Sequence, residues 1–194
     1  MTGRITTMDF LDADELEAGL PKILASPKDS GIVRMIVRRP SDGEREVMNT
    51  GELSLSDGLV GDNWRSRGSG RTDDGSAHPE MQLNLMNARV IALVAQTEDR
   101  WALAGDQLFV DLDLSKENLP AGTRLALGST IVEVTAVPHL GCKKFVSRFG
   151  VEAMKFVNSR RGKTLCLRGI NAKVVKPGRV STGDRVRKMS LPSH

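Results

Sequence analysis

The chain has 194 residues, of which 39% are apolar and 4% aromatic, and its 28 basic and 24 acidic residues give a net charge of +4. So few aromatic rings argue against a base-stacking nucleic-acid platform, and the two cysteines are too few for a disulfide scaffold or a four-thiolate metal site. We therefore expect a single globular domain that does not bind nucleic acid.

The first predicted element is a helix over residues 12–25. Asp12 is a typical N-cap residue, and Glu15 stands three positions later, as in a capping box. Apolar side chains follow at helical spacing, but Pro21 lies among them and predicts a division into two short helical turns. We assign residues 1–30 to an N-terminal helical extension.

The N-terminal sequence does not read as a targeting segment. Residues 1–20 contain five acidic side chains and one basic side chain, whereas a secretory signal begins basic and continues apolar. No uncharged apolar run approaches the roughly 18 residues of a membrane span. We expect a cytoplasmic protein without membrane contact.

From Ile32 onward the apolar residues recur mostly with a period of two, which is typical of half-buried strands. The strand candidates are residues 32–39, 44–49, 81–86, 107–112, 124–128, 130–137, 163–169, 171–178 and 184–189. Two helices are predicted between them, over residues 88–96 and 147–159. Many short strands with few helices predict a mainly β (α+β) fold: a closed or partly closed mixed β-barrel with a few peripheral helices.

We place the main domain at residues 31–189 and a tail at residues 190–194. Within the domain, residues 61–80 show no apolar periodicity. A loop of this length inside a compact domain is usually functional or mobile.

Cys142 is the residue with the most reactive predicted surroundings. It lies in the sequence PHLGCKKF, between a predicted strand and a predicted helix, and Lys143, Lys144 and Arg148 follow closely. Nearby cations and a helix N-terminus both favour thiolate over thiol. His139, three residues earlier, is placed to accept the thiol proton or to contact a ligand. The alternative is a small buried cysteine beside solvated lysines.

Cys166, the second cysteine, has a simpler interpretation. It lies in the alternating sequence LCLRG, which predicts a core residue on a strand. A reducing cytoplasm would also oppose a disulfide between the two cysteines.

The sequence TAVPHLGCKKFVSRFG, followed by RGINAKVVKPGRVSTGD, resembles the C-terminal half of a MOSC domain, the module at the C-terminus of molybdenum-cofactor sulfurases. Blocks at residues 58–64, 81–93 and 105–134 resemble the rest of that domain in the same order. The resemblance spans residues 30–188 and implies a β-barrel of the kind found in pyruvate kinase.

In this family one cysteine is thought to carry sulfur as a persulfide or to bind the metal of the molybdenum–pterin cofactor. The resemblance assigns that catalytic or metal-binding role to Cys142, with His139 beside it in sequence. Both roles require a thiolate, which accepts sulfane sulfur and suits a soft metal–sulfur centre.

The resemblance also implies which other residues would contact the cofactor. Its phosphate would be held by cations, for which the candidates are Lys143, Arg148 and Arg168. Four polar residues in the matching blocks either contact the pterin edge or hold turns: Asp62, Asn84, Asp106 and Asn171.

Two activities follow from the resemblance, and the sequence leaves open whether the chain is an enzyme. One is sulfur carriage or transfer, with a sulfur donor such as a cysteine desulfurase as partner. The other is reduction of N-hydroxylated small-molecule substrates, with an electron-donor protein as partner. The chain has no room for the desulfurase domain of full sulfurases, so we expect no independent pyridoxal-phosphate site. A non-catalytic module is the alternative, holding a small anionic ligand or a partner at the barrel mouth and the 61–80 loop.

Overall fold

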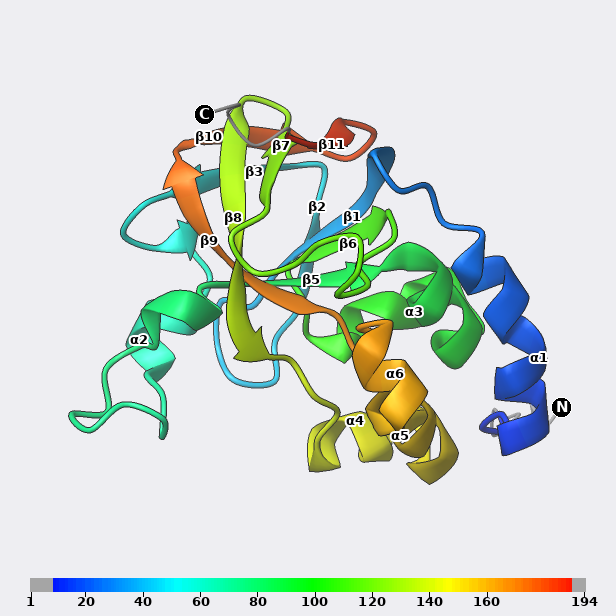
Figure 1. The fold of residues 1–194 in the computed structure, drawn as a ribbon. Helices are drawn as coiled ribbons and strands as arrows, with labels where there is room; N and C mark the ends of the chain where they lie inside the picture. Colours follow the sequence, from blue (N-terminus) through cyan, green and yellow to red (C-terminus); the bar gives the residue numbers. More distant parts are fainter. Residues whose placement is uncertain (1–8, 190–194) are drawn as a thin grey trace, which may run out of the picture.

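The computed structural model describes residues 9–189 and shows a β-barrel with most of its helices gathered on one side (Figure 1). The predicted tail at residues 190–194 lies outside the described residues, as do residues 1–8 of the predicted extension. The mainly β fold with peripheral helices is confirmed, while the domain limits stay a prediction.

Within the described chain, the strands form one eight-stranded sheet and one three-stranded sheet. The strands are β1 (Ser30–Arg38), β2 (Glu46–Met48), β3 (Thr50–Ser54), β4 (Gly58–Leu59), β5 (Leu83–Asn87), β6 (Leu108–Asp111), β7 (Arg124–Leu127), β8 (Thr130–Pro138), β9 (Ile170–Lys176), β10 (Gly178–Ser181) and β11 (Arg185–Lys188). The large sheet has the order β11-β7-β8-β9-β5-β6-β1-β2, and the small sheet has the order β10-β3-β4. Strands β3, β4 and β10 were not among the predicted elements.

The large sheet closes because β1 is shared among three neighbours. Its first residues pair with β11, its middle with β6 and its end with β2. At Gly31 the backbones come so close that a Cβ would lie 1.9 Å from the carbonyl oxygen of Asp111, so only glycine fits. Neighbouring strands are antiparallel except β5 and β6, which are parallel across a helical crossover. The barrel is therefore mixed, as predicted.

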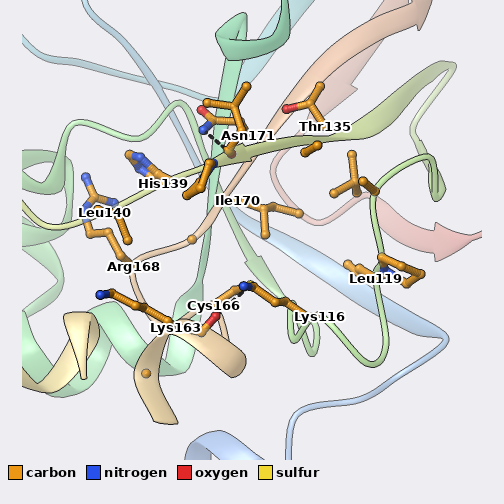
Figure 2. Close-up of a pocket in the computed structure, with 18 of the residues that line it drawn as sticks. Lys116, Leu119, Thr135, His139, Leu140, Lys163, Cys166, Arg168, Ile170 and Asn171 are labelled. Atoms are coloured by element: carbon orange, nitrogen blue, oxygen red, sulfur yellow. Dashed lines mark hydrogen bonds between the residues drawn. The ribbon is translucent and has the colours of Figure 1, made fainter. Parts of the chain in front are cut away.

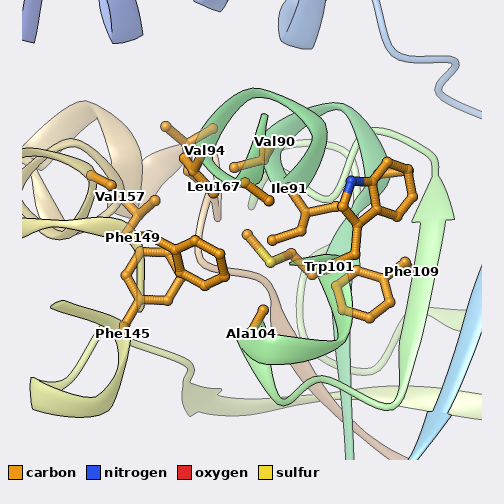
Figure 3. Packing of buried hydrophobic residues seen from close by; sticks show 14 of the residues in the cluster. Val90, Ile91, Val94, Trp101, Ala104, Phe109, Phe145, Phe149, Val157 and Leu167 are labelled. Carbon is orange, nitrogen blue, oxygen red and sulfur yellow. The ribbon is translucent and has the colours of Figure 1, made fainter. Parts of the chain in front are cut away.

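Most of the helices cover one outer side of this barrel, and α2 (Trp64–Arg67) lies apart from them (Figure 1). The others are α1 (Ala13–Leu24), α3 (Ala88–Ala95), α4 (Lys143–Phe149), α5 (Val151–Asn158), α6 (Arg160–Thr164) and two 3₁₀ helices, η1 (Pro79–Met81) and η2 (Glu98–Ala104). One apolar cluster fills the barrel, and a second joins the helices to it. In the second cluster, Phe145 and Phe149 of α4 lie near Ile91 and Val94 of α3 (Figure 3). This packing holds the N-terminus of α4 against the barrel.

Helix α1 confirms the predicted capping box and corrects the predicted break. The Asp12 side chain accepts a hydrogen bond from the Glu15 backbone, and the Glu15 side chain accepts one from the Asp12 backbone, both at 2.9 Å. The helix continues through Pro21 without interruption. Its buried face, which includes Leu16 and Leu20, packs on α3 and α5 and offsets the hydrogen bond that proline cannot donate.

The helix predicted over residues 147–159 is two helices, and the first begins earlier. Helix α4 starts at Lys143, directly after Cys142, and ends at Gly150, where α5 begins. Gly150 has φ +89°, a conformation that only glycine adopts easily, and this interrupts the helical hydrogen bonds. The earlier start matters because it makes Cys142 the N-cap residue of α4.

The strand predicted over residues 163–169 was wrong. Its first residues belong to α6, whose start is capped by the Ser159 side chain accepting from the Gly162 backbone at 2.9 Å. The rest is a turn in which Cys166 has φ 50° and Gly169 has φ 113°. Capping and left-handed backbone therefore override the alternating pattern, and Cys166 is half-buried in a turn instead of lying in a strand.

Residues 61–80 are not wholly irregular, since they contain α2 and part of η1. Trp64 of α2 is buried and fixes one end of the segment to the barrel. No helix within residues 9–189 is long and apolar enough to cross a membrane.

Candidate functional site

A buried group of three charged or polar side chains lies beneath the loop that joins β8 to α4. Arg168 Nη1 donates to both carboxylate oxygens of Asp106, at 2.9 and 2.7 Å. His139 Nε2 lies 2.8 Å from Asp106 Oδ1. The Asp106 side chain has no exposed surface, so its charge must be compensated inside the protein, where Arg168 supplies the opposite charge and His139 a further polar contact.

The protonation states in this group follow from burial and charge. Burial opposes ionisation of Asp106, but Arg168 and His139 outweigh it and hold the pKa of the carboxyl below its ordinary value. Burial and the nearby Arg168 charge lower the pKa of His139, with Asp106 opposing them in part. An ionised carboxylate only accepts hydrogen bonds, so the neutral His139 carries its proton on Nε2 and keeps a lone pair on Nδ1.

A second buried network joins three of the predicted cofactor-binding residues to Arg39. Arg39 Nε and Nη2 donate to the carboxylate of Asp62 at 2.9 and 2.6 Å. Arg39 Nη1 lies 3.4 Å from Asn84 Oδ1, and Asn84 Nδ2 donates to Asn171 Oδ1 at 2.6 Å. Asn171 in turn donates to the backbone of Val137 at 2.9 Å. These side chains tie β1, β5, β8 and β9 together at one end of the barrel.

Cys142 follows His139 by three residues, at the end of the loop between β8 and α4, and has an exposed side chain. Its backbone carbonyl accepts from Phe145 at 2.9 Å as α4 begins, while its thiol makes no capping hydrogen bond. The Phe145 ring lies 5.1 Å from the guanidinium carbon of Arg168. Arg168 therefore connects Asp106 with the first turn of α4, and this fixes the position of Cys142.

Two arginines near this helix have no acidic partner among the described residues. Arg45 follows β1, and Arg148 belongs to α4; a Cβ built on Gly105 would lie 3.4 Å from Arg45 Nη2 and 3.8 Å from Arg148 Nη1. Burial and the charge of Arg148 both lower the pKa of Arg45. Arg45 Nε is buried and makes no hydrogen bond within residues 9–189. An anion at this position would relieve both the repulsion and the missing hydrogen bond.

The two lysines after Cys142 differ in their surroundings. Lys144 forms an exposed ion pair with Asp42 at 3.2 Å. Lys143 is exposed and has no ion pair among the described residues. Together with Arg45 and Arg148 it gives helix α4 and its surroundings an excess of positive charge.

A cavity of about 600 Å³ opens against β8, β9 and α6. His139 and Leu140 line one end of it, whereas Cys142 is not part of its lining. Cys166 lies in its wall, beside Lys116 and Lys163 (Figure 2). Burial raises the pKa of the Cys166 thiol, which keeps it protonated near neutral pH.

The predicted site residues thus separate into two groups. Arg168, Asp106, His139, Asp62, Asn84 and Asn171 are held in buried or mostly buried networks, whereas Cys142 and Lys143 are exposed at the α4 N-terminus and Arg148 is half-buried in the last turn of α4. Their individual roles toward a cofactor stay predictions. Arg39 and Arg45 were missed, and the only available signal was the arginines before and after the PSDG turn.

No three His, Cys, Asp or Glu side chains within residues 9–189 gather in a way that would hold a metal ion. Helix α4 and its surroundings do combine the exposed thiol of Cys142 with guanidinium and ammonium groups that form no ion pair within residues 9–189, although Arg45 and Arg148 donate to the backbone carbonyls of Glu44 and Leu103. This arrangement is suited to an anionic ligand that carries its own soft centre.

The chain is similar to one known protein family and to several solved structures. A family model described as the MOSC domain matches residues 72–187. The YuaD protein from Bacillus subtilis is similar in structure, with a TM-score of 0.57 and 18% identity over 84% of this chain and 97% of that one. YiiM from Escherichia coli is similar with a TM-score of 0.52 and 20% identity, over 84% of this chain and 72% of that one. No curated protein matches the chain in sequence.

Proposed function

The chain belongs to the MOSC domain family, and we propose that it binds a molybdenum–pterin cofactor with Cys142 as the protein ligand to the metal. The observation that carries this proposal is the exposed, uncapped thiol of Cys142 at the start of α4, combined with two arginines without acidic partners in the described residues: Arg148 in the last turn of the same helix and Arg45 near it. A thiolate suits a soft metal–sulfur centre, and guanidinium groups suit a phosphate.

The residues present fit such a cofactor. Arg45 Nε is a buried donor without an acceptor, and neither Arg45 nor Arg148 forms an ion pair within the described residues. A phosphate between them would accept hydrogen bonds from both guanidinium groups. Lys143, the first residue of α4, would add a third cation close to Cys142.

Each part of the site then has a distinct task. Cys142 would hold the metal, and Arg45, Arg148 and Lys143 would bind the phosphate. The bound centre would supply two-electron reduction of N-hydroxylated small molecules, with electrons from a donor protein. His139 and its partner Asp106 would fix the loop before Cys142 and leave the His139 Nδ1 lone pair to accept a proton or hydrogen bond.

Sulfur carriage is a second function that the exposure of Cys142 favours. A thiolate at this position would attack the terminal sulfur of a donor persulfide. The new bond joins the two sulfurs at Cys142, the old sulfur–sulfur bond breaks, and the donor leaves as a thiolate. A cysteine desulfurase is the class of partner that supplies such a persulfide. This reaction requires Cys142 but not Arg45 or Arg148, so the two functions can be separated.

The test is elemental, pterin and intact-mass analysis of protein purified without oxygen from a cofactor-producing host. We expect up to one molybdenum and one pterin per chain in the wild type and much less of both in Cys142→Ser. Cys166→Ser is the matched control and should retain both. Metal-free wild-type protein that accepts a persulfide at Cys142 would replace the cofactor proposal with sulfur carriage.

Absence of metal, pterin and persulfide from the wild type would contradict both chemical functions. Ligand binding that is unchanged by Cys142→Ser would then favour the non-catalytic module.

A further inference from the structure

The cavity between β8, β9 and α6 has features of a binding site of its own. Its volume is about 600 Å³, within the roughly 300–1,000 Å³ typical of small-molecule sites. Aliphatic side chains form much of its wall, including Leu119, Val134, Val137 and Ile170. An apolar body of moderate size would be desolvated there.

The charges that line this cavity have one sign. Lys116 and Lys163 line it, and no aspartate or glutamate of the described chain does. The side chains of both lysines make no ion pair or hydrogen bond within residues 9–189. The third basic residue, Arg168, is already paired with Asp106. The two lysines are therefore the cavity's uncompensated charges.

The backbone holds these two lysines in neighbouring segments. Lys116 donates its backbone N–H to the carbonyl of Thr164 at 3.0 Å, one residue beyond Lys163. Cys166 follows in the same turn with φ 50°, a conformation that costs a non-glycine residue energy. Figure 2 shows Lys163, Cys166 and Lys116 along one side of the cavity, with Thr135 and Asn171 on the opposite side.

We propose that this cavity binds a small organic anion, with its apolar body against the β8–β9 wall and its carboxylate, sulfonate or phosphate group between Lys116 and Lys163. The polar groups on the opposite side are already used, since Thr135 donates to Glu80 and Asn171 donates to Val137. His139, at the far end of the cavity, offers the Nδ1 lone pair to a hydroxyl or N–H group on the ligand. The site goes beyond the proposed function of Cys142, which does not line it.

The experiment is calorimetric titration of the purified full chain with three matched probes: naphthoate, naphthalenemethanol and naphthylmethylammonium. We expect naphthoate to bind with a Kd below about 1 mM, the neutral alcohol more weakly and the cation not at all. Lys116→Ala and Lys163→Ala should each weaken naphthoate binding about fivefold, and the double variant should remove the preference for the anion. Lys176→Ala, an exposed lysine outside the cavity, is the matched control and should bind as the wild type does.

Two further measurements locate the probe. In Cys142→Ser protein, naphthoate should slow alkylation of Cys166 by N-ethylmaleimide, because the thiol lies in the cavity wall. In Arg148→Gln protein the affinity for naphthoate should be unchanged, since Arg148 lies in the last turn of α4 and does not line the cavity. Equal binding of anion and cation, an unchanged affinity in the lysine double variant, or a loss only in Arg148→Gln would overturn the proposal. The result is independent of the metal content of the protein.

Discussion

Two regions near the β8–α4 loop contain a pair of arginines each, and they differ in whether the arginines have acidic partners. Beneath the loop, each of the two buried arginines has its own carboxylate: Arg168 pairs with Asp106, and Arg39 pairs with Asp62. At the surface, Arg45 and Arg148 lie near each other without an acid between them. The same side-chain type thus fastens the fold in one region and remains uncompensated in the other.

This difference indicates which region is built for a ligand. The charges of the Arg168–Asp106 and Arg39–Asp62 pairs are compensated within the fold, although Arg168 Nε, like Arg45 Nε, makes no hydrogen bond within residues 9–189, and the cofactor roles of these residues stay predictions. Two like charges that lack a partner store repulsion, which an anion would relieve. Each prediction below would fail if the two regions were alike.

The largest effect is expected at Asp106. Asp106→Asn leaves Arg168 buried without a counter-charge, and breaking such a buried pair costs about 3–5 kcal/mol of unfolding free energy. Urea unfolding followed by tryptophan fluorescence measures this loss. Asp42→Asn removes the partner of Lys144 in an exposed pair and should leave the unfolding free energy unchanged. A similar small change in both variants would show that the buried network does not support the fold.

The second-largest effect is expected in the alkylation rates of the two cysteines. Cys142 is exposed beside cations, whereas burial raises the pKa of Cys166. We expect Cys142 to be alkylated by iodoacetamide at least about tenfold faster at neutral pH, as judged by peptide mass analysis over time. Equal rates, or a faster Cys166, would contradict the assignment of the reactive thiol.

A smaller effect is expected for the surface arginines. Inorganic phosphate should bind Arg148→Gln about fivefold more weakly than the wild type, because one of two guanidinium donors is lost. Its unfolding free energy should change little, since the relief of repulsion from Arg45 opposes the loss of the hydrogen bond that Arg148 Nη1 donates to the Leu103 carbonyl. Arg179→Gln, an exposed arginine on β10, serves as the control. Equal phosphate affinity in all three proteins would remove the phosphate role from Arg148.

The smallest effect is a pH dependence from His139. Because its pKa is lowered in the fold, the unfolded chain takes up a proton on acidification that the folded chain does not. The unfolding free energy should therefore fall as the pH drops below the ordinary histidine range, before the carboxylates titrate. Comparing the pH profiles of the wild type and His139→Gln isolates this contribution. A parallel decline in both proteins would show that His139 is not the group responsible.

The sequence predicted the barrel because a strand with one buried face alternates apolar and polar residues, and this alternation can be seen directly in the sequence. It failed at residues 163–169, where alternation was outweighed by the Ser159 cap and by the positive φ of Cys166 and Gly169. It also missed β3, β4 and β10, whose short pairings form only after the barrel brings distant segments together.

In the candidate site, the sequence predicted Cys142 but not Arg39 or Arg45. Cys142 could be found from adjacent lysines and a loop position, which are local signals. Arg39 and Arg45 could not, because their roles depend on contacts with Asp62 and Gly105 that lie far away in sequence. For the same reason the sequence did not distinguish Arg168, which pairs with the Asp106 carboxylate, from Arg148, which forms no ion pair within residues 9–189 and donates only to the backbone carbonyl of Leu103.

X-ray absorption at the molybdenum edge tests the central claim most directly, because it counts the sulfur atoms bound to the metal. The account predicts that wild-type and Cys166→Ser proteins share the same sulfur coordination. Any metal retained by Cys142→Ser should show one sulfur neighbour fewer. Unchanged sulfur coordination in Cys142→Ser would show that Cys142 is not the ligand and would contradict the account.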